Sequence, residues 1–420
     1  MKISTINKFI YLFLSLTLLL GFYFGEDSAG SGGFISDFFK TMPFVKDPFN
    51  FETHLGLGKI DNKFPLHYVL VSFIFDIWGR VDFFRLTYCI ISIFCPLLFF
   101  YCLKLKFKKI DQNLLFLFSL IILIMPSFRS GAIWPNTQIT AIFFLLSSIV
   151  FLLRWENKKI KIINTNLILS LFFMSLAVYT RQLYALVFLF YLYIFFTKLN
   201  LKNFILVTFI IFSLALPGLY FIYKVPSILT FWFSPKAEAT SYPIFFNTIL
   251  INLSIISFYL LPIYLFLFFD KKIKINLKNL EHLFTIFFLL LIVIFLSFFF
   301  NYNYKMGGGF LMKLSVYFFN NFYFFYLSSF LGLIFLYFIA IENKNNLFLI
   351  IILIIGFTTH YIFQKYFEPM FIILLFTLFK TRLTVNFLSS KKNTYFLYIY
   401  YLFYLTAAIT NDVMQISKNI

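Results

Sequence analysis

The chain has 420 residues, of which 61% are hydrophobic, 24% are aromatic and only 12% are charged. Because soluble globular proteins carry about 25% charged residues, this composition excludes a water-soluble domain. Apolar runs near the ~20 residues of a spanning helix recur along the whole length, and the alternating strands of a membrane β-barrel do not occur. The sequence therefore predicts an all-α, polytopic transmembrane helical bundle that forms one domain over residues 1–420.

The first apolar run, residues 9–24, follows Lys2 and Lys8 and ends without a clear cleavage site. We therefore expect an uncleaved first helix rather than a signal peptide. The apolar runs give about 13 expected spans in all. Their expected ranges are 9–24, 84–103, 113–126, 138–153, 166–179, 183–197, 203–222, 244–269, 282–300, 315–340, 346–361, 366–379 and 394–410.

The longest expected outer loop lies between the first two spans, over about residues 25–82. It contains "PLHYVLVSFIFDIWGR", residues 65–80, which is short for a span and carries His67, Asp76 and Trp78. We expect this segment to form a helix in the outer interface, where aromatic side chains are favoured. Treating it as a span would place the later basic loops on the outer side.

The formal net charge of +19 is explained by topology. With the N-terminus inside, every strongly basic loop falls on the inner side, as the positive-inside bias requires. These loops are "KLKFKKID", "RWENKKIKI", "KLNLK", "DKKIKINLK", "ENKNN" and "KTRLTVNFLSSKK". We therefore expect an integral protein of the bacterial inner membrane with a cytoplasmic N-terminus and membrane lipids around it. A nucleic-acid partner is not expected.

Ionisable residues concentrate at the expected outer ends of spans, which favours a reaction at the membrane surface over ion-coupled transport. Glu26 and Asp27 follow the first span and precede the glycine-rich stretch "SAGSGGF". A carboxylate at a partly dehydrated interface can act as a general base, so both are candidate catalytic residues. The alternative is that the two acids only mark the end of a helix.

Other outer segments carry side chains that could bind a phosphate or a substrate. An arginine can hold a phosphate through two hydrogen bonds, although an arginine at the bilayer edge can also be a simple anchor. The glycine-rich stretch "NYNYKMGGGFLMK" could hold an anion through its backbone N–H groups or act as a gating loop. The candidates for this role are His67, Arg129, Arg181, Gln182, Lys305, His360 and Lys365.

The three cysteines, Cys89, Cys95 and Cys102, have spacings that fit neither a metal site nor a disulfide framework. We expect them to be buried small residues.

The first outer loop resembles that of the GT-C glycosyltransferase superfamily. This superfamily includes the dolichyl-phosphate-mannose-protein mannosyltransferases and the bacterial aminoarabinose transferases. The resemblance is carried by Glu26-Asp27, the segment "KFPLHYVL", Gly79 and Arg85-Leu86. The chain departs from the family pattern at Phe64, where a first proline is usual, and in the order of its two acids.

The resemblance implies transfer of a sugar from a polyprenyl-phosphate donor to a lipid, glycan or protein acceptor on the outer face. It implies that Asp27 or Glu26 is the acidic group, and it assigns no role to Arg85. No cofactor is implied, and a divalent metal is left open. The alternatives are a glycan polymerase or ligase, and a transporter or flippase of lipid-linked sugars.

Overall fold

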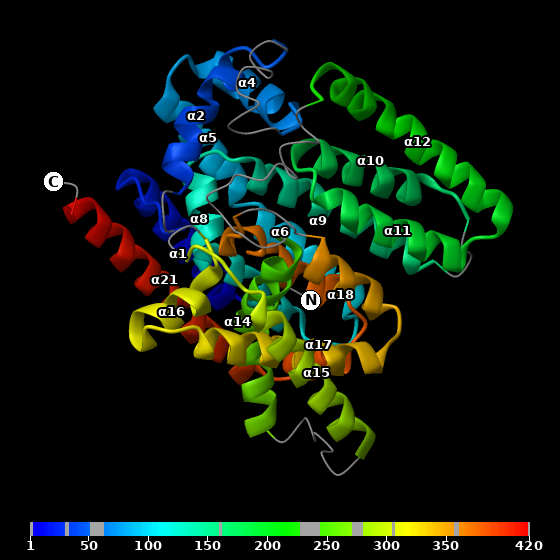
Figure 1. Ribbon diagram of the computed structural model, residues 1–420. Helices are drawn as coiled ribbons and strands as arrows, with labels where there is room; N and C mark the ends of the chain where they lie inside the picture. The colour runs from blue at the N-terminus through cyan, green and yellow to red at the C-terminus, as the bar shows by residue number, and fades with distance from the viewer. Residues whose placement is uncertain are drawn as a thin grey trace. The chain divides into compact units, whose positions relative to one another are not determined.

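The computed structural model describes residues 3–29, 33–50, 63–158, 162–226, 244–270, 280–304, 307–356 and 361–418. Throughout these ranges the regular structure is helical, as the sequence predicts (Figure 1). The chain divides into two compact units. Unit 1 comprises Met1–Phe231 and Tyr401–Ile420, and unit 2 comprises Trp232–Tyr400. The expectation of a single domain stays a prediction.

Unit 1 is built from the N-terminal helices, several of which begin at a polar residue that caps them. Asn136, Asn164 and Asn200, for example, each accept a backbone N–H bond from the first turn of the helix that follows. The elements are α1 (Thr5–Tyr23), α2 (Phe34–Lys46), α4 (Leu66–Trp78), α5 (Val81–Ser92), α6 (Cys95–Lys106), α7 (Gln112–Ser119), the 3-10 helix η2 (Leu120–Ile124), α8 (Pro126–Ile133), α9 (Thr137–Glu156), α10 (Thr165–Thr180), α11 (Tyr184–Lys198) and α12 (Leu201–Lys224). Figure 1 shows α10, α11 and α12 side by side, and they contact one another.

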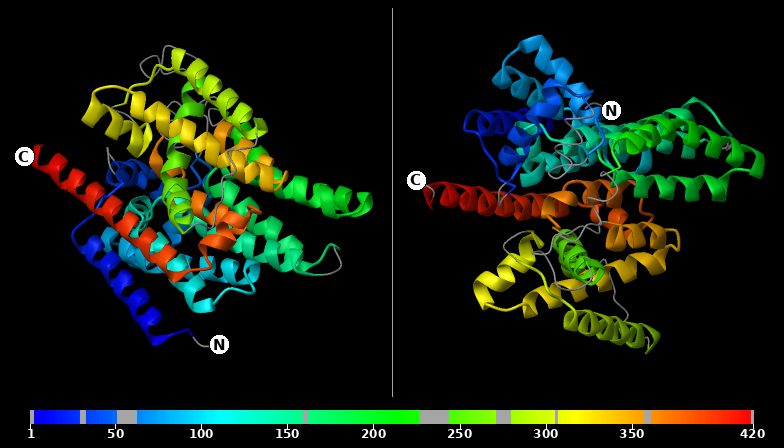
Figure 2. Two further views of the ribbon diagram at one scale, coloured as in Figure 1. Left: turned by 90° about the horizontal axis from the view of Figure 1, so that it is seen from below. Right: turned by 45° about the horizontal axis from the view of Figure 1, so that its top comes forward.

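Unit 2 is centred on the pair α14 and α17, which approach closely through small side chains. Ser329 Oγ donates to the Leu250 carbonyl at 2.8 Å, and the Ser254 and Ser328 hydroxyls are 2.7 Å apart. The elements are α14 (Ile244–Phe269), α15 (Leu280–Phe298), α16 (Gly309–Phe319), α17 (Tyr323–Glu342), α18 (Asn346–Ile355), the 3-10 helix η3 (Gln364–Tyr366), α19 (Met370–Thr377) and α20 (Arg382–Phe387). The last helix, α21 (Lys391–Lys418), belongs partly to each unit and is drawn in red in Figure 2.

Seven helices in the described ranges are long and apolar enough to cross a membrane, or up to eight if one bent pair counts as a span. They indicate an integral membrane protein. The larger count of about 13 is not confirmed, because several apolar runs are divided or cut short. Asn320, with a φ of 52°, ends α16 inside the expected span 315–340, and α18 has only 10 residues.

The bent pair consists of Gln112–Ile124 and Pro126–Ile133, which meet at an angle of 67°. Near the start of this pair, the Ser4 backbone N–H donates to Asn113 Oδ1 at 2.8 Å. Just beyond its end, Trp134 Nε1 donates to the Glu26 carbonyl at 3.0 Å. Residues 112–133 therefore run from beside the N-terminus of α1 to beside its C-terminus, as a broken span does and a re-entrant loop does not.

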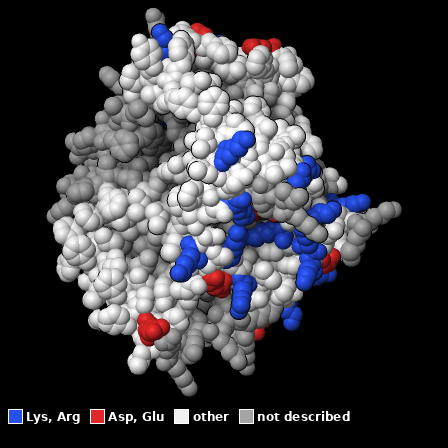
Figure 3. All heavy atoms as spheres, turned by 90° about the vertical axis from the view of Figure 1, so that its right-hand side faces the viewer, with Lys and Arg blue, Asp and Glu red and all other residues white. Residues whose placement is uncertain are grey.

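The helix ends of unit 1 near the start of α7 carry mostly basic residues. At this end, Asn157 Nδ2 donates to the Leu105 carbonyl at 3.1 Å, and Lys198 pairs with Glu156, so the C-termini of α6, α9 and α11 lie together. We call these termini, together with the residues that directly follow them, the basic end of unit 1. Its residues are Lys104, Lys106, Lys108, Lys109, Arg154, Lys158, Lys198 and Lys202. Figure 3 shows several Lys and Arg side chains close together, with few Asp or Glu among them, on the side of the molecule that it faces.

Candidate functional site

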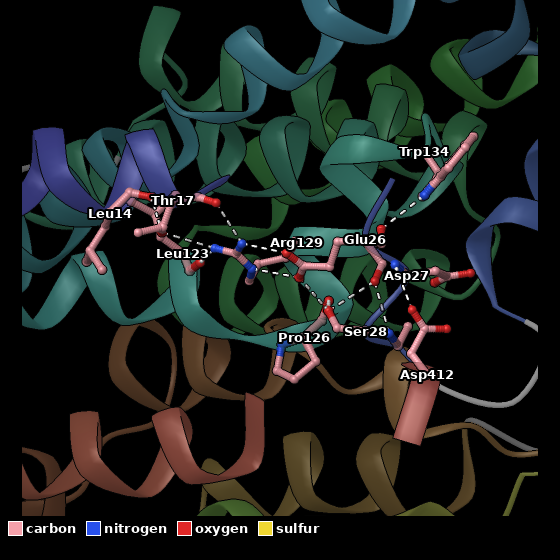
Figure 4. Close-up of polar contacts among 12 residues, drawn as sticks. Leu14, Thr17, Glu26, Asp27, Ser28, Leu123, Pro126, Arg129, Trp134 and Asp412 are labelled. Carbon is pink, nitrogen blue, oxygen red and sulfur yellow. Dashed lines mark hydrogen bonds and ion pairs between the residues drawn. The ribbon is translucent and has the colours of Figure 1, made fainter. Parts of the chain in front are cut away.

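The end of unit 1 opposite the basic end holds a buried ion pair between Glu26 and Arg129 (Figure 4). Arg129 Nε lies 2.8 Å from Glu26 Oε1, and Arg129 Nη2 lies 2.6 Å from Glu26 Oε2. This two-point contact is the strongest geometry that an arginine and a carboxylate can form. Arg129 is only 4% exposed, so the pair forms within the protein interior.

The remaining N–H groups of Arg129 are also committed. Nη2 donates to the Thr17 carbonyl at 2.9 Å, and Nη1 donates to Thr17 Oγ1 at 3.3 Å and to the Leu123 carbonyl at 3.4 Å. Together with the two bonds to Glu26, these contacts use every donor of the guanidinium. The phosphate-binding role expected for Arg129 stays a prediction, and in this structure all of its donors make contacts within the protein.

Gly21 of α1 leaves the space in which this ion pair forms. A Cβ at this position would overlap Glu26 Oε2 and lie 2.9 Å from Arg129 Nη2. The loop beyond α1 is fixed by Ser28, whose hydroxyl lies 2.8 Å from Glu26 Oε1 and 3.2 Å from the Pro126 carbonyl. Glu26 is thus enclosed by α1, α8 and its own loop.

Asp27 points away from the ion pair, as Figure 4 shows. Its Oδ2 accepts the backbone N–H of Ile35, in the first turn of α2, at 3.1 Å. The positive end of the helix dipole stabilises a carboxylate at this position. Gly33 permits the contact, because a Cβ there would lie 2.5 Å from both carboxylate oxygens. Asp27 is buried, and its carboxylate is not bound by Arg129 as that of Glu26 is.

Asp412 is a further acid at this site, and the sequence analysis missed it. The Asp27 backbone N–H lies 3.4 Å from Asp412 Oδ2, across a separation of 385 residues. Burial and the nearby charge of Asp27 raise the pKa of Asp412. Asp412 is the sole acid in α21, which is the one sequence signal that could have singled it out.

His67, expected to bind substrate, is buried in a polar network between α4, α5 and α9. Its Nδ1 lies 2.9 Å from Thr140 Oγ1, and the Tyr88 hydroxyl lies 2.8 Å from the same oxygen. Burial, with the nearby charge of Lys63, lowers the pKa of His67 to about 3. The imidazole is therefore neutral near pH 7, so it offers no positive charge to a phosphate there.

This pKa predicts a pH dependence of stability. An unfolded histidine gains its proton below pH 6.5 while buried His67 does not, so acidification favours the unfolded chain. From pH 7.5 to pH 5, the wild type should lose roughly 2 kcal/mol more stability than His67→Gln. Unfolding in detergent at the two pH values measures this difference, and His282→Gln in unit 2 is the matched histidine control. Equal losses in the wild type and His67→Gln would contradict the burial argument.

Arg181 and Gln182 lie in the tight turn between α10 and α11. The Tyr184 backbone N–H donates to the Arg181 carbonyl at 3.1 Å, and the Ala185 backbone N–H donates to the Gln182 carbonyl at 2.9 Å. Arg181 is largely buried. These bonds close the turn, and the expected role of both residues in substrate binding stays a prediction.

The remaining candidates lie elsewhere in the chain. Lys365 is part of η3 in unit 2, where its ammonium lies 5.2 Å from the centre of the Phe363 ring. The expectation that Lys365 lies close to Glu26 and Asp27 stays a prediction. Lys305 and His360 lie outside the described residues.

The glycine stretch at residues 307–309 has φ values between 79° and 86°, which glycine adopts freely. The Gly308 N–H donates to the Ile362 carbonyl at 2.7 Å, and the Phe310 N–H donates to Gln364 Oε1 at 3.2 Å. Those two N–H groups are therefore bound to protein acceptors rather than open to an anion. The glycines are explained by the conformation of the chain.

Glu368 is a fully buried acid in unit 2, to which the sequence analysis gave no role. The Tyr259 hydroxyl lies 3.1 Å from Glu368 Oε2, and Gln364 Nε2 donates to the Tyr259 hydroxyl at 3.1 Å.

Cys89, Cys95 and Cys102 are buried and form no disulfide, as expected. In the described part of the chain, no group of three or more His, Cys, Asp or Glu side chains is arranged to hold a metal ion.

No protein-family model matches this chain, and neither a curated protein nor a solved structure matches it. The resemblance to the GT-C superfamily therefore rests on the motifs between Glu26 and Leu86 alone. The site combines Glu26, whose charge is balanced by Arg129, with a second acid, Asp27, that accepts a backbone N–H bond from the first turn of α2. Such an arrangement can support a general base or orient a hydroxyl group.

Proposed function

We propose that this protein is a membrane glycosyltransferase of the GT-C type. It would move a sugar from a polyprenyl-phosphate donor to a lipid, glycan or protein acceptor at the outer membrane face. The observation that carries the proposal is that two adjacent acids have different partners. Glu26 is bound by Arg129, while Asp27 is fixed separately at the end of the first span.

The proposed chemistry uses Asp27 as the base. A hydroxyl group of the acceptor attacks the anomeric carbon of the sugar and gives its proton to the Asp27 carboxylate. The bond from the sugar to the phosphate oxygen breaks, and the phosphate leaves with the electron pair. A fixed carboxylate near the end of a span suits a donor whose lipid tail lies in the bilayer.

The proposed orientation places the basic end of unit 1 in the cytoplasm. Positive residues concentrate on the cytoplasmic side of membrane proteins, and the described part of this end carries eight Lys and Arg residues, from Lys104 to Lys202. Glu26 and Asp27 lie at the other end of unit 1, just beyond the C-terminus of α1, where Trp134 contacts Glu26. Under this orientation Asp27 faces the outer side, where lipid-linked sugars are used.

Reconstitution of the purified chain in lipid vesicles tests the function. Polyprenyl phosphates that carry a radiolabelled sugar are supplied with lipid and glycan acceptors, and the label is followed into products. We expect transfer of single sugar units to an acceptor. Growth of the label into long chains would instead identify a glycan polymerase, and the absence of transfer for every donor and acceptor would refute the proposal.

Transport is the second candidate function, and Glu368 is the observation that favours it. A fully buried carboxylate that accepts a hydrogen bond from a hydroxyl group is typical of sites where membrane proteins couple transport to protons or ions. In the same vesicles, a transporter would move the labelled lipid between leaflets without changing it. Glu368→Gln should slow that movement if transport is the function, and should leave it unchanged otherwise.

A further inference from the structure

Arg85 of α5 is buried close to the acidic site, with its guanidinium largely uncommitted. Its Nε donates to the Ile133 carbonyl at 3.2 Å, but its Nη1 lies 3.7 Å from the carboxylate of Asp82, whose side chain is 76% exposed. Nη2 is buried and has no hydrogen-bond partner among the described residues. A contact with an exposed carboxylate at this distance contributes little, so the charge of Arg85 lacks a strong counter-charge.

The guanidinium is nevertheless held rigidly. Its central carbon lies 3.4 Å from the centre of a Trp134 ring and 5.1 Å from the centre of the Phe22 ring. Cation–π contacts of this kind fix the plane of an arginine without using its N–H groups. The same indole donates Nε1 to the Glu26 carbonyl, so Arg85 adjoins the loop that carries Glu26 and Asp27.

The contrast with Arg129 indicates what Arg85 is suited to do. Every donor of Arg129 is used inside the protein, whereas Arg85 makes one hydrogen bond of its own within the described residues. A planar guanidinium with free N–H groups matches the oxygens of a phosphate. Arg85 also lies near the start of the candidate span Val81–Lys106, at the level where a lipid head group would meet the protein.

We propose that Arg85 binds the phosphate of a lipid-linked phosphate ester. This inference rests on the proposed function, in which such an ester is the sugar donor. The phosphate reaches Nη1 from the side of Asp82, whose exposed side chain turns away, and contact with the buried Nη2 requires the side chains over it to move. The stacked Trp134 keeps the guanidinium plane in position for a two-point contact.

Binding to the purified full-length chain in neutral detergent tests this proposal. The probes are a short isoprenyl monophosphate, the matching isoprenol and inorganic phosphate. Loss of a charge-assisted contact costs about 1.5–3 kcal/mol, so Arg85→Gln should bind the isoprenyl phosphate roughly 10- to 100-fold more weakly. Arg85→Lys, which keeps the charge but not the planar fork, should fall between. Arg80→Gln is the matched control, because Arg80 is exposed just before α5 and should bind as the wild type does.

Equal affinity of the wild type and Arg85→Gln would overturn the proposal, as would isoprenol binding as tightly as its phosphate. Inorganic phosphate binding as tightly as the ester would overturn the lipid part. If Arg85→Gln does not fold, Arg85→Lys decides, and unchanged affinity in that folded variant counts against the proposal. Binding that depends on Arg85 without any sugar transfer refutes the transferase function but not this inference. Transfer that is unaffected by Arg85→Gln refutes this inference alone.

Discussion

Glu26→Gln and Arg129→Met are each expected to destabilise the protein by about 3–5 kcal/mol, because each leaves the other buried charge without its partner. The double variant should lose far less than the sum of these values, since a buried pair replaced by neutral side chains leaves no uncompensated charge. Denaturant or thermal unfolding in detergent of the wild type, both single variants and the double variant gives the coupling energy.

The ion pair between Lys198 and Glu156 is a matched control within unit 1. Their side chains are 26% and 19% exposed, against 5% and 9% for Arg129 and Glu26. Pairs that water reaches contribute about 0–1 kcal/mol, so Glu156→Gln and Lys198→Met should cost little. Additive losses for Glu26→Gln and Arg129→Met would contradict a structural ion pair and leave Glu26 as a catalytic candidate and Arg129 as a substrate-binding candidate.

Asp27→Asn is expected to reduce sugar transfer by roughly 10²- to 10⁴-fold, the usual contribution of a general base. The change should hardly affect stability, because an asparagine oxygen can still accept the Ile35 N–H bond. Initial rates in reconstituted vesicles and unfolding curves of the same preparations measure the two effects separately. A lost activity with an intact fold distinguishes Asp27 from Glu26, whose substitution should affect both.

Asp37→Asn provides the comparison for Asp27→Asn, since Asp37 is the acid in the first turn of α2 and should be dispensable for transfer. Asp27→Glu keeps the carboxylate but moves it toward Gly33, where little space remains, so partial activity is expected. Full activity of Asp27→Asn would remove the proposed base. In that case Asp412, which contacts the Asp27 backbone, would be the acid to test next.

Composition and charge patterning predict part of this structure well. The helical class follows from long apolar runs, and the position of Glu26 and Asp27 beyond the first helix follows from where such a run ends. The different partners of the two acids could not be predicted. Arg129 reaches Glu26 only because the folded chain also brings Thr17 and Leu123 to the same guanidinium. Periodicity carries no information about such contacts.

The differences between the expected spans and the helices of the structure have local physical causes. Hydropathy does not detect a residue with a left-handed backbone conformation such as Asn320. The sequence therefore predicts one span over residues 315–340, where the structure has the end of α16 and most of α17. Asp412 lies 385 residues from Asp27, and one sequence gives no signal that they meet. The sequence alone assigns no role to Arg85, because only the folded structure shows that its Nη2 has no hydrogen-bond partner among the described residues.

The Glu26–Arg129 pair also has a consequence for how the chain enters the membrane during synthesis. Inserting an unpaired arginine costs about 2.5–3.5 kcal/mol at the centre of a spanning helix and less toward its end, where Arg129 lies. Glu26 is synthesised 103 residues before Arg129, at the end of the first apolar helix. When the broken span that carries Arg129 leaves the ribosome, its counter-charge is already in place. We therefore expect Glu26, just beyond the first helix, to lower the cost of inserting this arginine-bearing segment.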